Sequence, residues 1–154
     1  MAAEGMATAP THQRTDGGTP FICDEDTWLT ATAGTARHAA AADTTVLDAV
    51  AGHLLALQWP GGGWSYTESA RLTDVDCTSA AVQVFHLTGP RRHRAAISRG
   101  IGARHALRGP DGGFPAYLAG APSEASMSAA AVPELHARGR HRFRAPCEMK
   151  GILL

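Results

Sequence analysis

The stretch Gln58–Trp64, which reads QWPGGGW, decides the fold of this 154-residue chain. Fifty residues later the stretch Arg108–Phe114 reads RGPDGGF, so a Gly-rich turn that ends in an aromatic residue returns at a fixed spacing. A third such turn, Asp16–Gly18 before Phe21, lies near the N-terminus and is shifted from this spacing. A fixed period of this size is typical of stacked supersecondary units.

A short polar segment follows the turns at the same spacing. Residues 24–28 read DEDTW, residues 74–78 read DVDCT and residues 124–128 read EASMS, and the last two lead into alanine-rich runs. Polar side chains ahead of an apolar run are typical of helix starts, because they satisfy free backbone N–H groups there. Each segment therefore predicts that a helix begins, and the acidic middle segment suggests the chemistry.

The composition favours helices, because alanine is abundant, β-branched residues are sparse and no strand-like alternation persists. We expect helices over residues 27–42, 44–58, 76–87 and 91–107, and a further helix that begins after Pro122 and is interrupted at Pro133. The expected N-caps are Asp26, Asp43, Asp76 and Ser123. A single helix hairpin cannot bury its apolar face alone, so the prediction is an all-α stack of hairpins.

The chain divides into three parts by composition. Residues 1–20 are rich in Ala, Thr, Gly and Pro and are expected to be a flexible lead-in. Residues 21–137 hold the helical repeats. Residues 138–154 form a basic irregular tail. A short run of charged residues is more often a solvated segment than a nucleic-acid-binding patch, so we expect the tail to be solvated. A change of reading frame is another explanation for this tail.

Charge and cysteine content limit the function classes. Hydrophobic residues make up 44% of the chain, which is enough for a core. The formal net charge is zero, so no overall charge attracts the protein to nucleic acid. The cysteines Cys23, Cys77 and Cys147 are odd in number and widely spaced, which favours free thiols in a reducing cytoplasm. The sequence shows no secretory signal and no membrane-spanning stretch, so membrane contact would be peripheral.

Gln58–Trp64 resembles the QW motif of the terpene cyclases, in which Gln is followed by Gly-x-Trp. Arg108–Phe114 is similar to a degenerate copy, with Arg for Gln and Phe for Trp. Such repeats occur in the α/α-toroid superfamily, which includes squalene–hopene cyclases, oxidosqualene cyclases, class II diterpene cyclases and protein prenyltransferase β subunits. The resemblance covers about residues 20–136 and implies an α/α-toroid-type arc. It implies structural roles for the QW-like residues Gln58, Gly62, Trp64, Gly113 and Phe114.

The segment Asp74–Thr78 resembles the DxDD(T) acid motif of class II cyclases, with Cys77 in place of the last Asp. It is also similar to the Asp-Cys-Thr of oxidosqualene cyclases, in which the Asp is the acid. By either match the proton donor maps to Asp76, which would start cyclisation of a linear isoprenoid by protonating an alkene or epoxide. Asp74 or Cys77 would hold and polarise this acid, and Thr78 would fix the start of the helix.

Two other interpretations of these residues stay open. Asp76 is explained without catalysis if it is an N-cap, as Asp26 and Ser126 would be one period away on each side. Prenyltransferase β subunits hold zinc through Asp, Cys and His, but the spacing here differs, and His86 lies about two and a half helical turns beyond Cys77. We therefore predict no metal site. Core packing is the expected role of Trp28, Tyr66 and Phe85.

The length of the chain conflicts with the activity that the resemblance implies. A closed toroid needs about 300 residues at this period, whereas this sequence supplies two hairpins and a broken third. We expect an incomplete arc, inactive alone, that needs further repeats, copies of itself or a second cyclase half. The complete enzyme would be an isomerase or lyase without a cofactor, or with Mg²⁺ if its substrate is a diphosphate. The alternative is a non-catalytic scaffold that binds a partner or a lipid.

Overall fold

The computed structural model describes residues 15, 18, 26–67, 70 and 72–131. Within these residues every regular element is a helix and there is no strand, so the all-α prediction is confirmed. The helices are α2 (Asp26–Ala39), α3 (Thr44–Ala56), α4 (Val75–Thr88), α5 (Arg94–His105) and α6 (Ala125–Ala130). None of them is long and apolar enough to cross a membrane.

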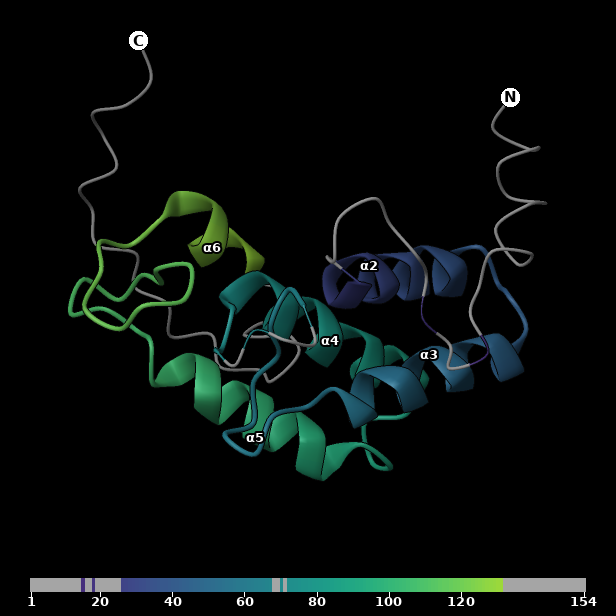
Figure 1. Ribbon diagram of the computed structural model, residues 1–154. Helices are drawn as coiled ribbons and strands as arrows, with labels where there is room; N and C mark the ends of the chain where they lie inside the picture. The colour runs from purple at the N-terminus through teal and green to yellow at the C-terminus, as the bar shows by residue number, and fades with distance from the viewer. Residues whose placement is uncertain (1–14, 16–17, 19–25, 68–69, 71, 132–154) are drawn as a thin grey trace, which may run out of the picture.

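The helices form two rows, with α2, α4 and α6 in one row and α3 and α5 in the other (Figure 1). Helix α4 lies at the centre, because it packs against α2, α3, α5 and α6. Helices α2 and α3 make one hairpin, α4 and α5 make the next, and α6 begins a third unit. The result is an open arc of stacked hairpins.

The 50-residue period is visible in the backbone hydrogen bonds of the two turns. In the first turn the Trp59 N–H donates to the Gly63 carbonyl at 3.0 Å, and in the second the Gly109 N–H donates to the Gly113 carbonyl at 2.9 Å. Gly62 and Gly112 occupy equivalent positions with φ of 98° and 84°. Because this region disfavours side chains, each turn requires glycine there.

Trp64 joins the first turn to three helices. Its ring is fully buried, and its indole N–H donates to the Leu54 carbonyl of α3 at 2.6 Å. The ring centroid lies 5.7 Å from that of Phe85 in α4. On α5, a Cβ added to Gly100 would come within 2.8 Å of the Trp64 ring. The expected core role of Phe85 is confirmed, and Trp28 and Tyr66 pack against the same core while partly exposed.

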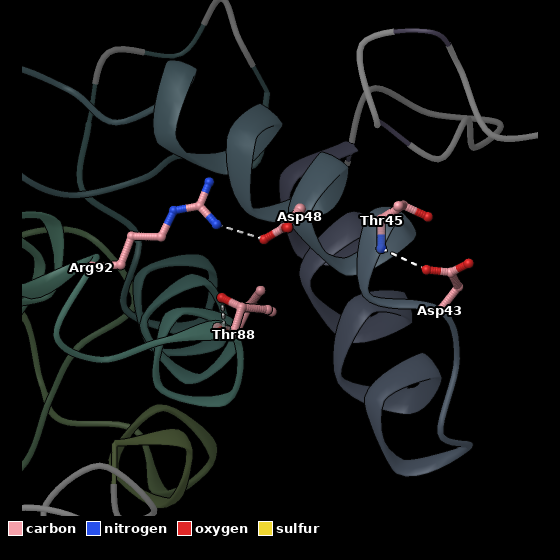
Figure 2. A network of polar contacts seen from close by, with 6 residues as sticks. Asp43, Thr45, Asp48, Thr88 and Arg92 are labelled. Carbon is pink, nitrogen blue, oxygen red and sulfur yellow. Dashed lines mark hydrogen bonds and ion pairs between the residues drawn. The ribbon is translucent and has the colours of Figure 1, made fainter.

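The opposite end of the hairpins is joined by an ion pair. The Arg92 guanidinium, before α5, donates to the Asp48 carboxylate of α3 at 2.7 Å (Figure 2). Figure 2 also shows the Asp43 carboxylate accepting from the Thr45 N–H at 2.9 Å, which confirms Asp43 as the N-cap of α3. Both Arg92 and Asp48 are well exposed, so the ion pair contributes little to stability.

Three other predicted helix starts were wrong by one or two residues. Helix α2 includes Asp26 as its first residue, α4 has Asp74 rather than Asp76 as its N-cap, and α6 has Glu124 rather than Ser123. Helix α5 is also shorter than predicted at both ends. The Pro133 interruption, Cys23, Cys147, the tail and nearly all of the lead-in lie outside the described residues.

Candidate active site

The N-terminus of α4 is built around Asp74. Its carboxylate accepts a hydrogen bond from the Cys77 N–H at 2.8 Å, which is N-cap geometry. Its own backbone N–H donates to the Trp64 carbonyl at 2.8 Å, so the Gly-rich turn fixes where the helix begins. In the next unit the Glu124 N–H donates to the Phe114 carbonyl at 2.9 Å, although the Glu124 side chain forms no cap bond.

Thr78 holds the same turn from the other side. Its buried hydroxyl accepts a hydrogen bond from the Trp64 N–H at 3.0 Å. Ser128, one period later, accepts from the Phe114 N–H at the same distance. A hydroxyl therefore fastens the turn to the following helix in both units, and this contact sets the start of the helix that carries the carboxylates.

Asp76 lies in the first turn of α4 and is not an N-cap, so the capping explanation of this residue is wrong. The capping role belongs to Asp74, two residues earlier. The Asp76 side chain is partly exposed, and its carboxyl has no hydrogen-bond partner among the described residues. Partial burial raises the pKa of Asp76 above its ordinary value. Asp76 is thus the carboxyl of the motif that can meet another molecule.

Asp74 is fully buried, and burial raises its pKa. The hydrogen bond from Cys77 lowers this pKa, and the charge of nearby Asp76 raises it further. One carboxyl oxygen, Oδ2, is buried without a hydrogen-bond partner among the described residues. A buried oxygen of this kind is less costly when the carboxyl is neutral, so this environment favours the protonated acid.

The remaining motif residue, Cys77, is a buried cysteine whose backbone N–H donates to the Asp74 cap. In the zinc interpretation it would join Asp74 and His86. The described residues contain no group of three or more His, Cys, Asp or Glu side chains that could hold a metal ion. His86 lies in the last turn of α4, at the other end of the helix from Asp74, so this ligand set does not assemble.

Asp76 shares the exposed side of α4 with Ala80, Gln83 and Leu87. These positions recur every three or four residues, so they form one stripe along the helix. The other faces of α4 are buried against neighbouring helices. Ala80 is the next residue along the stripe and is itself partly buried against the core.

A cavity of about 330 Å³ lies elsewhere, beside the first turn. It does not contain Asp76 or Asp74. Within its wall the Trp59 indole N–H donates to the Ser65 hydroxyl at 2.8 Å. The lining residues are Thr27, Ala56, Leu57, Gln58, Trp59, Pro60, Ser65 and Thr67.

The sequence interpretation did not single out Arg104, which is fully buried in α5. Its guanidinium donates to the Ser79 hydroxyl of α4 at 3.2 Å and lies 5.4 Å from the centre of the Phe114 ring. The 50-residue period could have predicted this burial, because the residue 50 positions before Arg104 is Leu54, an apolar residue that is also buried.

The chain is similar to known proteins over part of the length of those proteins. No family model matches the chain. It is 42% identical over 141 residues to the drimenyl diphosphate synthase of Streptantibioticus cattleyicolor, a match that covers 84% of this chain and 26% of that protein. It is 37% identical over 122 residues to the drimenyl diphosphate synthase of Streptomyces showdoensis, which covers 79% of this chain and 23% of that protein.

The matched stretches include the candidate site. Because each covers more than three quarters of the chain, residues 74–78 in its middle fall inside both. The chain spans about a quarter of the length of the curated relatives it matches. Over that length, the two matches relate this chain to the terpene cyclases that its turn and acid motifs resemble.

Proposed function

We propose that this chain is the acid-bearing part of a terpene cyclase, in which Asp76 starts the cyclisation of a linear isoprenoid by protonation. One observation carries the proposal: Asp74 caps the helix, which leaves Asp76 on the exposed stripe of α4 without a hydrogen-bond partner among the described residues. The relationship to drimenyl diphosphate synthases supports it.

The proposed step transfers one proton from the Asp76 carboxyl to a carbon–carbon double bond. The π electrons form the new C–H bond, the other alkene carbon becomes a cation, and Asp76 is left as a carboxylate. A second double bond of the same substrate then attacks the cation and closes a ring. An alkene is a very weak base, so the acid has to be positioned and kept from water.

The buried position of Asp74 suits this role. Burial raises the pKa of Asp74, and an ionised Asp76 raises it further. We propose that Asp74 stays neutral in the reactive state, because one of its buried oxygens has no hydrogen-bond partner among the described residues. A neutral Asp74 places no negative charge beside Asp76, and such a charge would make Asp76 a weaker acid.

Catalysis would require more protein than the arc. Asp76 is partly exposed on an open stripe, and an acid in contact with water does not protonate an alkene efficiently. Since the chain spans about a quarter of its relatives, we propose that further repeats or a second cyclase half cover this stripe.

The name of the relatives, drimenyl diphosphate synthase, describes a diphosphate as what they make, which favours a diphosphate substrate for this chain as well. A divalent cation such as Mg²⁺ commonly accompanies phosphate groups. The described residues provide no cluster of His, Cys, Asp and Glu to hold it, so they do not fit as a metal site. Any ion would be held by the substrate and by residues outside this part of the chain.

The test is complementation. The chain is produced together with a Streptomyces showdoensis synthase that lacks the stretch matched by this chain, and the pair is supplied with farnesyl or geranylgeranyl diphosphate. Cyclic products are measured by mass spectrometry. We expect Asp76→Asn to abolish the product while the helical circular dichroism of the chain is unchanged. Product that persists at the wild-type rate in Asp76→Asn would exclude Asp76 as the acid and favour a non-catalytic scaffold.

A further inference from the structure

Three buried rings form a row in the core between the first turn and the start of α5. The centroid of the Trp64 ring lies 5.7 Å from that of Phe85, and the Phe85 centroid lies 4.8 Å from that of His93. Trp64 and Phe85 are fully buried, and only 5% of His93 is exposed. Because a protein core is close-packed, a displacement of His93 reaches Trp64 through Phe85.

A hydrogen bond joins the start of α5 to the same turn. The Gln58 side-chain amide donates to the carbonyl of Ala96, in the first turn of α5, at 2.9 Å. The same amide donates to the Gly62 carbonyl of its own turn at 2.8 Å. In the second turn the Arg108 Nε makes the equivalent bond to the Gly112 carbonyl at 3.0 Å. The start of α5 is therefore coupled to the first turn through Gln58 as well as through the rings.

The first turn holds the helix that carries the candidate acid. The Trp64 N–H donates to the Thr78 hydroxyl at 3.0 Å, and the Trp64 carbonyl accepts from the Asp74 N–H at 2.8 Å. Asp76 lies between these two positions, in the first turn of α4. The carboxyl of Asp76 therefore follows a movement of Trp64.

The site of His93 suits a neutral imidazole. Its Nε2 atom is buried and has no hydrogen-bond partner among the described residues. A buried charge without a partner is costly. His93 is also the N-cap residue of α5 and forms no side-chain cap bond. A positive charge at this position meets the positive end of the helix dipole, which disfavours it further.

The charged groups around His93 also oppose its protonation. Arg92 and Arg94 flank it in the sequence, and burial and the Arg92 charge hold the pKa of His93 below its ordinary value. From α3, Asp48 favours the charged form, but its carboxylate already binds Arg92 (Figure 2). From α4, the last turn brings one titratable side chain, His86.

We propose that His93 is a positioning residue for proton transfer by Asp76, and that protonation of His93 releases the start of α5 and shifts the first turn. The inference rests on the proposed function of Asp76. His93 acts at a distance from the substrate, through Phe85 and Trp64. A neutral ring at position 93 keeps the acid helix in place, whereas an imidazolium leaves its buried site.

The first test needs no reaction. The Trp64 indole N–H, which donates to the Leu54 carbonyl, is followed by two-dimensional NMR of the full chain between neutral and mildly acidic pH. Trp64→Phe assigns the resonance. We expect the Trp64 resonance to shift with the same midpoint as the His93 imidazole and to lose this shift in His93→Phe, which keeps a ring but takes no proton. His38→Phe, the same change at an exposed histidine of α2, should leave the shift intact.

A second variant tests the coupling without changing the ring. Asp48→Asn removes an exposed carboxylate that favours the charged form of His93. The midpoints of the His93 imidazole and of the Trp64 indole should therefore fall together. The proposal is overturned if the Trp64 resonance does not titrate, if it keeps its shift in His93→Phe, or if its midpoint stays in place while that of His93 falls.

Product formation in the complementation assay tests the positioning role. His93→Ala removes the ring, so kcat should be lower at every pH, while KM is unchanged because His93 does not touch the substrate. His93→Phe should keep kcat at neutral pH and lose less of it in mild acid than the wild type does. Equal pH profiles of the wild type and His93→Phe would contradict the proposal. Product from Asp76→Asn would instead contradict the assignment of the acid, so the two failures are distinguishable.

Discussion

The hydroxyl of Thr78 and the backbone N–H of Trp64 form a buried hydrogen bond of 3.0 Å that ties the candidate acid helix to the Gly-rich turn. Because the same contact recurs between Ser128 and Phe114, it is a property of the repeat. Asp76 is therefore positioned by a helix that this hydroxyl fastens to the turn.

Thr78→Val should destabilise the chain, because it leaves the Trp64 N–H buried without its partner. The expected loss in the free energy of unfolding is about 1–3 kcal/mol. Thr78→Ser keeps the hydroxyl, as the second unit does, and should lose less. Urea unfolding followed by circular dichroism measures both, and equal stability of the Val and Ser variants would contradict the role.

Asp74→Ala should lower the free energy of unfolding by about 1 kcal/mol through loss of the N-cap. Asp76→Ala should change it by less than about 0.5 kcal/mol, because its carboxyl is partly exposed and has no described hydrogen-bond partner to lose. Thermal unfolding of the two variants separates the capping residue from the candidate acid. A larger loss for Asp76→Ala would reverse the assignment.

The two N-cap aspartates should give opposite pH dependence. Burial raises the pKa of Asp74 above 3.8, so the stability that it contributes is present below pH 3.8 and is lost as the pH rises through its folded pKa. Hydrogen bonds from Thr45 lower the pKa of the exposed Asp43, so its contribution is present above pH 3.8 and is lost as the pH falls. Unfolding free energies of Asp74→Asn and Asp43→Asn, measured from acid to neutral pH against wild type, should differ in the sign of their slope.

His93 should make the chain less stable in mild acid. Burial and then the charge of Arg92 lower its pKa below 6.5, while Asp48 opposes the shift. Its contribution to stability is complete above pH 6.5 and is lost as the pH falls through the folded pKa. An NMR titration of the imidazole should show the lowered pKa, and Asp48→Asn should lower it further. A His93 pKa that rises in Asp48→Asn would be inconsistent with this arrangement.

Two glycines of α5 should respond oppositely to alanine. Gly102 faces open space, so Gly102→Ala should stabilise the chain by about 0.5–1 kcal/mol through helix propensity. Gly100 faces the Trp64 ring and Val82, so Gly100→Ala should destabilise it by about 1–3 kcal/mol through overpacking. Chemical unfolding of both variants makes the comparison, and stabilisation by Gly100→Ala would indicate that α5 lies farther from the turn.

The sequence was sufficient for the helices and the period, since alanine content, Gly-rich turns and apolar spacing all act locally. It was not sufficient to decide which aspartate caps α4. Asp74 and Asp76 are both good caps, and the choice depends on contacts of Trp64 with Asp74 and Thr78 across ten or more residues. Local pattern does not contain those contacts.

The burial of Arg104 shows a second limit. An arginine in an Arg-rich helix is ordinarily exposed, and only packing against Ser79 and the Phe114 ring places it inside. An alignment of the two units places Leu54 and Arg104 at the same position, and it would have identified position 104 as buried. It would not have identified the partners.

The exchange of Gln58 for Arg108 means that the two units are not interchangeable, although their turns close with the same hydrogen bonds. An amide at this position suits a neighbour that brings a cation, whereas a guanidinium suits a neighbour that brings an anion. With an arginine in place of Gln58, the Arg99 guanidinium would lose the oxygen that accepts its hydrogen bond and would meet a side chain that can only donate.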